Sequence, residues 1–447
     1  MEFLDFKEAL FKKAKEEGLE KYEIYYITKE SLEVKSYEVQ VEGYALSDSK
    51  GLCFRALIDG NMGYSYTEKL DIEAIDILIK GVKDSAKFIK NEDQEFIYGG
   101  GSKYETVKAE NESLKNLSAE EQIKMVLELE EKTKNYAKEV EKVAECAMET
   151  TSGSVTIINS EGLNVSRKYN TAYSYVAPVV LDGTEMVDGF NIVVSNNVLD
   201  YDIDKMAKES VEDALIKRGA KPVKSGNYRI LLSNEMMAVM LKIFQSAFNS
   251  DKVQKGLSLL KGKEGETIAS EIVNIVDNPL MNNGPCSTPF DDEGVETKFK
   301  YLVKDGVFQT LLYNLKTANK AGVKTTGNAS KTSFSSAVEV AATNLYLESG
   351  NLNFEELVSL VNDGLYITSL EGTHAGANAV TGDFSLAASG RVIRNGVLCE
   401  AVNQITVAGN FFDVLKDIEA IGNDFKFYHS NTASSSVIIK GLAVAGE

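Results

Sequence analysis

Residues 371–385 read Glu371-Gly-Thr-His-Ala-Gly-Ala-Asn-Ala-Val-Thr-Gly-Asp-Phe-Ser385, and no other stretch of the chain has this composition. Small residues dominate it, and polar side chains recur at short intervals. Small residues let a backbone approach another chain closely, and the free amides of such a segment can donate hydrogen bonds. The stretch therefore fits either a peptide-binding cleft or a tight turn region in which His374 is satisfied by a backbone carbonyl.

The sequence on either side of this stretch predicts both helices and strands. In the first half, amphipathic periodicity and turn residues predict helices at 4–17 and 71–89, a helix starting at 118, a helix at 204–218, and strands at 22–28, 31–43 and 51–57. The second half is predicted to contain a strand at 228–232, helices at 234–248, 310–321 and 353–361, and otherwise mostly β structure. Because the order lacks regular βαβ alternation, we predict an α+β fold with two lobes. A mixed α/β N-terminal domain would span 1–220, and a mainly antiparallel, β-rich C-terminal domain 221–447, divided at the linker Lys221–Gly226.

Several local signals fix the ends of these elements. The sequence Ser118-Ala-Glu-Glu121 predicts a capping box, in which the serine and glutamate side chains satisfy each other's backbone amides. Asp59-Gly60, Asp305-Gly306 and Asn395-Gly396 are typical of tight hairpin turns. Phe411 and Phe412 are either core residues at a helix start or apolar residues of an interface.

Composition excludes several classes of protein. The chain has 447 residues, of which 43% are hydrophobic and 26% charged, and a formal net charge of −19. Such acidity disfavours nucleic-acid binding, and no basic patch offsets it. The charged N-terminus is not a secretory signal, and no apolar run is long enough to span a membrane. The four isolated cysteines fit a reducing compartment, so we expect a cytoplasmic protein.

The supply of histidine limits the chemistry that the chain can perform. Its two histidines are His374 and His429, whereas a helical zinc-peptidase site needs two histidines on one helix face and a glutamate base. The helix predicted at 234–248 carries Glu235 but no histidine. We therefore expect no metal bound by this chain. A self-sufficient hydrolase that uses His374 with Asp383 is a further hypothesis.

Consecutive motifs in the second half carry a family resemblance. The segments Gly376–Ser385, Ala388–Gly390 and Ile405–Asn410 resemble the C-terminal signature of the TldD/PmbA family, also called modulators of DNA gyrase. Upstream, Ser287–Val295 and Lys304–Val307 are similar to its central motif. Members are peptidases of two kinds: one binds zinc through an HExxxH helix, and its partner, the PmbA or TldE kind, lacks those ligands.

The resemblance implies that this chain is of the PmbA/TldE kind. We expect it to pair with a TldD-type subunit, or with a second copy of itself, and to act on peptides, with zinc held only by the TldD-type partner. Neither a nucleic-acid partner nor a membrane is expected. Candidate peptide-binding residues are those at the start of the 234–248 helix and in the quoted stretch: Asn234, Glu235, Thr373, His374, Asn378 and Asp383. The alternative is a stand-alone peptide-binding or scaffold protein without peptidase activity.

Overall fold

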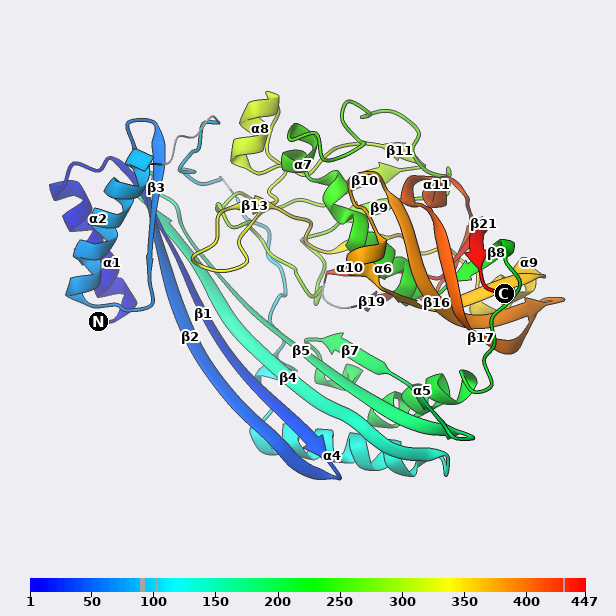
Figure 1. Cartoon of the computed structure of the whole chain (residues 1–447). Coiled ribbons are helices and arrows are strands. Elements are labelled where there is room, and N and C mark those ends of the chain that lie inside the picture. The colour runs from blue at the N-terminus through cyan, green and yellow to red at the C-terminus, as the bar shows by residue number, and fades with distance from the viewer. Residues whose placement is uncertain (89–92, 102, 429–430) are drawn as a thin grey trace.

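The computed structural model describes residues 1–88, 93–101, 103–428 and 431–447, so His429, one of the two histidines of the sequence, lies outside the described residues. Helices and strands occur in both halves, which confirms the α+β fold (Figure 1). No helix within those ranges is long and apolar enough to cross a membrane.

One long, curved antiparallel sheet dominates the first half. Its order is β3 (Asn61–Thr67), β2 (Gln40–Ile58), β1 (Lys21–Tyr37), β4 (Val140–Asn159), β5 (Asn164–Asp182) and β6 (Glu185–Asp188), and β7 (Asn191–Ser195) also pairs with β5. The four central strands have 17 to 20 residues each, well beyond the usual strand length. Together they form an arch that curves around the second half of the chain (Figure 1).

The strand prediction was wrong in this sheet. Residues 22–28 and 31–43 do not form two strands, because β1 runs without a break to Tyr37. The chain turns at Glu38 and Val39, which have φ angles of 53° and 57°. These residues lack the Gly or Asn that normally marks such a turn, so no local signal predicted it.

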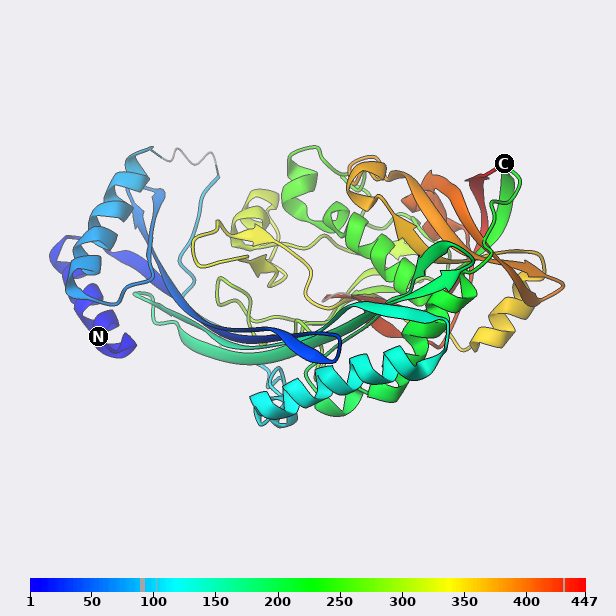
Figure 2. The ribbon, with the colours of Figure 1, turned by 60° about the horizontal axis from the view of Figure 1, so that its bottom comes forward.

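Helices cover the outer face of the arch at both ends. At one end lie α1 (Phe3–Glu16) and α2 (Ile72–Phe88), and at the other α4 (Ala119–Tyr136) and α5 (Ile203–Ile216) (Figures 1 and 2). Helix α1 buries Phe6, whereas Leu4 in its first turn is 66% exposed. Along β5, alternate side chains such as Ala172 and Val176 are buried beneath α4 and α5. The residues between them face the concave side.

The cap and turn signals are confirmed. Ser118 and Glu121 form the predicted capping box at the start of α4. Positive φ angles occur at all three predicted hairpin turns: Asp59, Gly60, Asp305, Gly306, Asn395 and Gly396. The local sequence was enough to predict these turns, because each one needs a left-handed backbone conformation that Gly, Asn and Asp tolerate.

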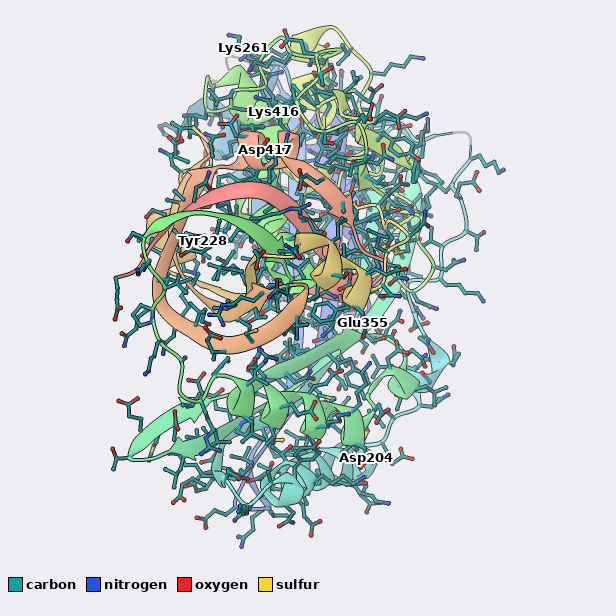
Figure 3. All side chains as sticks on the ribbon, turned by 90° about the vertical axis from the view of Figure 1, so that its right-hand side faces the viewer. Asp204, Tyr228, Lys261, Glu355, Lys416 and Asp417 are labelled. Atoms are coloured by element: carbon teal, nitrogen blue, oxygen red, sulfur yellow. The ribbon has the colours of Figure 1, made fainter. Side chains whose placement is uncertain are left out.

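The second half contains a sheet that closes on itself. Its order is β17 (Val397–Asn410), β16 (Asp383–Arg394), β15 (Gly364–Glu371), β8 (Gly226–Leu232), β21 (Val437–Ala445) and β18 (Ile418–Ile421), and β17 also pairs with β21. Figure 3 looks onto this ring of strands, with Tyr228 of β8 and Glu355 of α9 (Phe354–Val361) labelled. A second six-stranded sheet has the order β11 (Val307–Phe308), β10 (Lys300–Lys304), β9 (Ile275–Asp277), β14 (Leu345–Leu347), β20 (Thr432–Ser434) and β19 (Lys426–Tyr428).

Helix α6 (Asn234–Phe244) lies in the core between these sheets. It is shorter than the predicted 234–248 helix, because residues Gln245–Phe248 form a 3₁₀ turn. Phe244 stacks on Phe411 with ring centroids 4.6 Å apart. Phe411 and Phe412 are 0% and 8% exposed, so they are core residues and not an exposed interface.

The predicted helix at 310–321 is also shorter in the structure. It is α8 (Leu315–Ala321), which begins where the Asn314 side chain accepts a hydrogen bond from the Thr317 amide. The strands of the arch end at Ser195 and those of the other sheets begin at Gly226. We therefore keep the division into 1–220 and 221–447 as a proposal.

Candidate functional site

A cavity of about 380 Å³ lies beside α6. Three of its residues, Val239, Lys242 and Ile243, have the i, i+3, i+4 spacing that places them on one face of that helix. The opposite wall comes from the short helix α10 (Thr373–Gly376) and from β19 and β20. The complete lining is Val239, Lys242, Ile243, Thr373, His374, Ala377, Ala379, Tyr428 and Thr432.

The cavity combines apolar walls with hydrogen-bond donors, and none of the lining residues that the structure describes is a carboxylate. The Lys242 ammonium donates to Oδ1 of Asn431 at 2.8 Å. Partial burial lowers the pKa of Lys242. Burial also raises the pKa of Tyr428 to about 12, so its hydroxyl stays protonated at neutral pH. This arrangement favours an uncharged or anionic ligand over a cation.

Two of the predicted site residues, Thr373 and His374, line this cavity. Two others lie at the start of α6. The Asn234 side chain donates to the carbonyl of Asp424 at 2.6 Å, and the Glu235 carboxylate pairs with Lys426 at 2.8 Å. Both side chains thus hold the beginning of the helix against residues 424–426, and neither is among the lining residues.

Asn378 and Asp383 shape the turn that follows α10. The Asn378 amide donates to the carbonyl of Asp383 at 2.8 Å, and its side chain accepts from the Val380 amide at 3.0 Å. The Asp383 carboxylate accepts from the Asn410 side chain at 2.9 Å. No hydrogen bond joins His374 to Asp383, two residues that the structure describes, so a hydrolase built on that pair gains no support.

Sequence reasoning missed Lys242, Tyr428 and Thr432. For Lys242 a signal existed, because Val239, Lys242 and Ile243 form a short stripe at helical spacing next to the predicted candidates. The other two residues reach the cavity from a hairpin formed by β19 and β20. Nothing in their local sequence distinguishes them from ordinary strand residues.

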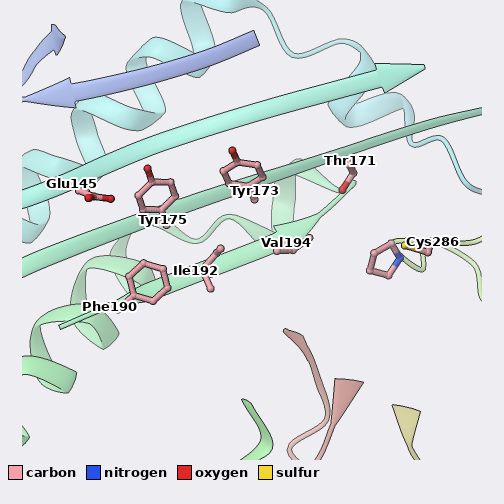
Figure 4. Close-up of a pocket in the computed structure, with 9 residues that line it drawn as sticks. Glu145, Thr171, Tyr173, Tyr175, Phe190, Ile192, Val194 and Cys286 are labelled. Carbon is pink, nitrogen blue, oxygen red and sulfur yellow. The ribbon is translucent and has the colours of Figure 1, made fainter. Parts of the chain in front are cut away.

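A second, apolar pocket of about 610 Å³ lies on the concave face of the arch. Tyr173 and Tyr175 of β5 stand opposite Val194 and Ile192 of β7, and Cys286 lies across from them (Figure 4). The remaining lining residues are Glu145, Thr171, Phe190 and Pro285. Offset aromatic and branched side chains of this kind make large apolar contacts with little loss of conformational entropy.

The two cavities neighbour each other. Strand β19, which supplies Tyr428 to the first, lies against β7, which supplies Ile192 and Val194 to the second. The Lys242 ammonium also lies near enough to Cys286 to oppose the rise in the pKa of its thiol. The concave side of the molecule therefore offers an apolar surface next to a donor-lined cavity.

A buried charged cluster joins the arch to the segment Ser287–Val295. Within the arch, Arg55 pairs with Glu23 at 2.7 Å, and Arg55 also lies 4.0 Å from Glu293 of that segment. Arg167 of β5 pairs with Asp292 at 2.8 Å, and the Tyr25 hydroxyl donates to the same carboxylate at 3.1 Å. The motif thus has a structural function, because it fixes the arch against the second half of the chain.

The neighbouring carboxyls Asp291 and Glu293 should make stability depend on pH. Burial raises the pKa of both, and for Asp291 the charge of Glu293 adds to the effect. A raised pKa means that the folded protein binds the proton more tightly than the unfolded chain does. The free energy of unfolding should therefore fall as pH rises from about 4, near the unfolded values of 3.8 and 4.5, to about 8, the folded pKa of Asp291. Denaturant unfolding at a series of pH values measures this.

A matched pair of variants tests whether the buried carboxyls cause this pH dependence of stability. Glu293→Gln keeps an oxygen for the Leu315 amide, with which Glu293 bonds at 2.9 Å, and removes the titration. We expect the free energy of unfolding of Glu293→Gln to fall less steeply with pH than that of the wild type. Glu355→Gln, on an exposed residue of α9, should keep the wild-type slope. Equal slopes in all three proteins would contradict the assignment.

Sequence models of PmbA/TldA metallopeptidase domains match most of the chain. The first domain matches residues 22–86, the central domain 112–218 and the C-terminal domain 225–446. Together with the arch and the closed sheet, these matches define the class of protein as a metallopeptidase-family fold. The chain belongs to the TldD/PmbA family.

Relatives and solved structures agree with the assignment of the chain to the TldD/PmbA family. A metalloprotease of Methanothermobacter thermautotrophicus is 30% identical over 61% of this chain and 61% of its own length. The metalloprotease PmbA of Escherichia coli O157:H7 is 30% identical over 49% of this chain and 46% of its own. The aligned region thus spans less than two thirds of either relative. A crystal structure from Thermotoga maritima, described as a modulator of a DNA gyrase, has a TM-score of 0.92 and 30% identity, and the match covers 99% of this chain and 100% of the other.

Zinc is the metal that this family implies, and the described residues beside α6 do not fit it. The cavity-facing positions of α6 are Val239, Lys242 and Ile243, none of which is a zinc ligand under ordinary conditions. In the part of the chain that the structure describes, no group of three or more His, Cys, Asp and Glu side chains is arranged to hold a metal ion. No chemical step is therefore assigned to zinc in this chain.

Proposed function

We propose that this chain is the PmbA/TldE-type subunit of a cytoplasmic, two-component metallopeptidase that processes peptides. In this proposal, a TldD-type partner with an HExxxH helix holds zinc and cleaves the peptide bond. The present chain binds part of the peptide and completes the enzyme. The chain itself then has a recognition function and no zinc.

The observation that carries the proposal is the composition of α6. The family match extends from residue 22 to residue 446, yet the helix beside the cavity presents Lys242 between two aliphatic residues. A peptidase site of the helical zinc type needs two histidines there. The chain has two histidines in all, one of them in α10 and the other at position 429.

The concave surface supports a function in peptide binding. The apolar pocket formed by β5 and β7 has the size and the aromatic lining that suit side chains of an unfolded peptide. The cavity beside α6 supplies hydrogen-bond donors close to it. The acidic net charge of −19 speaks against a nucleic-acid substrate, so the gyrase label of the family gains no support from this chain.

Co-expression with a family member that carries HExxxH tests the proposal. We expect the two chains to co-purify in equal amounts, with zinc present in the complex and absent from the present chain purified alone. Stoichiometric zinc in this chain alone would disprove the proposed division of labour. The present chain could instead bind peptide and form only homodimers, without pairing with the zinc-bearing protein. That result would favour the alternative, a stand-alone peptide-binding protein.

A further inference from the structure

Lys242 is in an unusual position for a cation in this protein. The chain has 67 acidic and 48 basic residues, and many lysines of the described surface pair with carboxylates. Lys242 instead bonds to the neutral amide oxygen of Asn431. That bond uses one of the three hydrogens of the ammonium group. The other two are available to a ligand in the cavity.

The carboxylate nearest along the helix is already neutralised. Glu235 lies in the first turn of α6, about 10 Å along the helix axis from Lys242, and it pairs with Lys426 at 2.8 Å. Among the described lining residues Lys242 is the one Lys, Arg, Asp or Glu side chain, and the accessible ring of His374 and the hydroxyl of Thr373 add possible donors. An anion bound here would also offset the partial loss of hydration that lowers the pKa of Lys242.

The walls of the cavity restrict the kind of anion. Val239, Ile243, Ala377 and Ala379 give it apolar sides around the single charge. A volume of about 380 Å³ is near the lower limit for small-molecule sites, so it suits one amino-acid residue better than a long segment. A carboxylate attached to a small apolar side chain matches both features.

We propose that the cavity beside α6 binds the C-terminal residue of a peptide, with its free α-carboxylate on Lys242 and its side chain against the aliphatic walls. The proposal rests on the proposed function in that the ligand is a peptide, and it adds which end of the peptide this subunit recognises. The preceding residues of the peptide would lie toward the neighbouring apolar pocket of β5 and β7.

Peptide binding to the purified full chain tests the site. The probe is a short fluorescent peptide that ends in valine, prepared with a free C-terminal carboxylate and as the C-terminal amide. We expect the free acid to bind about tenfold more tightly, as a charge-assisted hydrogen bond provides. An amidated peptide with a glutamate inside its sequence should bind no better than the plain amide, which distinguishes the terminal carboxylate from a side-chain one.

Substitutions of Lys242 test whether the preference for a free C-terminal carboxylate arises in this cavity. Lys242→Met should lower the affinity for the free acid to that of the amide, and Lys242→Gln provides a polar replacement in case the methionine perturbs folding. Lys205→Met, on an exposed lysine of α5, should keep the wild-type preference. The proposal is overturned if acid and amide bind equally, if neither binds, or if Lys242→Met keeps the preference.

The outcome is separable from that of the proposed function. Binding is measured on this chain alone, whereas the proposed function depends on a zinc-bearing partner. A carboxylate preference without pairing would leave the site intact and contradict the two-component enzyme. Pairing without a carboxylate preference would support the two-component enzyme and contradict the proposed site beside α6.

Discussion

Arg55→Met should destabilise the protein by about 3–5 kcal/mol, because it leaves carboxylates buried without their cation. The Arg55 and Glu23 side chains are 6% and 1% exposed, and they pair at 2.7 Å. Among the described residues, the Asn159 amide would then be the remaining hydrogen-bond donor to Glu23, at 2.9 Å. Glu293 would also lose the positive charge 4.0 Å away that opposes the rise of its pKa. Denaturant unfolding of the full chain measures the loss.

Two comparisons identify the cause. Combining Arg55→Met with Glu23→Leu removes both charges, and we expect it to recover most of the lost stability, since the unpaired buried charge is the main cost. Arg394→Met breaks an ion pair with Glu400 in which both side chains are more than half exposed, and it should cost at most about 1 kcal/mol. Similar losses for Arg55→Met and Arg394→Met would contradict the importance of burial.

Phe244→Ala should be about as damaging, with an expected loss of about 3–5 kcal/mol. Phe244 is fully buried, stacks on Phe411 at 4.6 Å between centroids and also approaches Phe384 of β16. Its removal leaves a cavity between α6 and the strands behind it. Unfolding of the variant in denaturant, at an unchanged m-value, measures the effect.

An exposed aromatic residue provides the control for Phe244→Ala. Phe299 is 43% exposed, and Phe299→Ala should cost about 1 kcal/mol or less. Because Phe244 lies one residue beyond Ile243 of the cavity, Phe244→Ala should also weaken peptide binding. Wild-type stability in Phe244→Ala would contradict the assignment of α6 to the main core.

The sequence predicted those features that depend on a few neighbouring residues. The box at Ser118 and the turns at Asp59, Asp305 and Asn395 follow from local chemistry, and all are present. The turn at Glu38 and Val39 was missed because the pairing of β1 with β2 along their whole length imposes it, not the preference of the two residues. The helix predicted at 310–321 is shortened in a similar way, because Leu312 forms a β-bridge with Asn249 and the helix starts only at Leu315.

The candidate site was predicted only in part. Thr373 and His374 line the cavity, and their part in peptide binding stays a prediction. Asn378 and Asp383 instead stabilise a turn, because short polar side chains bond readily to nearby backbone. Lys242 and Thr432 meet only after residues far apart in the chain are folded together, and one sequence carries no direct signal of such proximity.

The most direct test of the account is the rate of peptide cleavage as this chain is added to a fixed amount of a family member that carries HExxxH. We predict little cleavage by either protein alone, a rate that rises with this chain and a plateau at equal amounts of the two. A rate that does not change when this chain is added, or cleavage by this chain alone, would contradict its assignment as the partner subunit of a two-component peptidase.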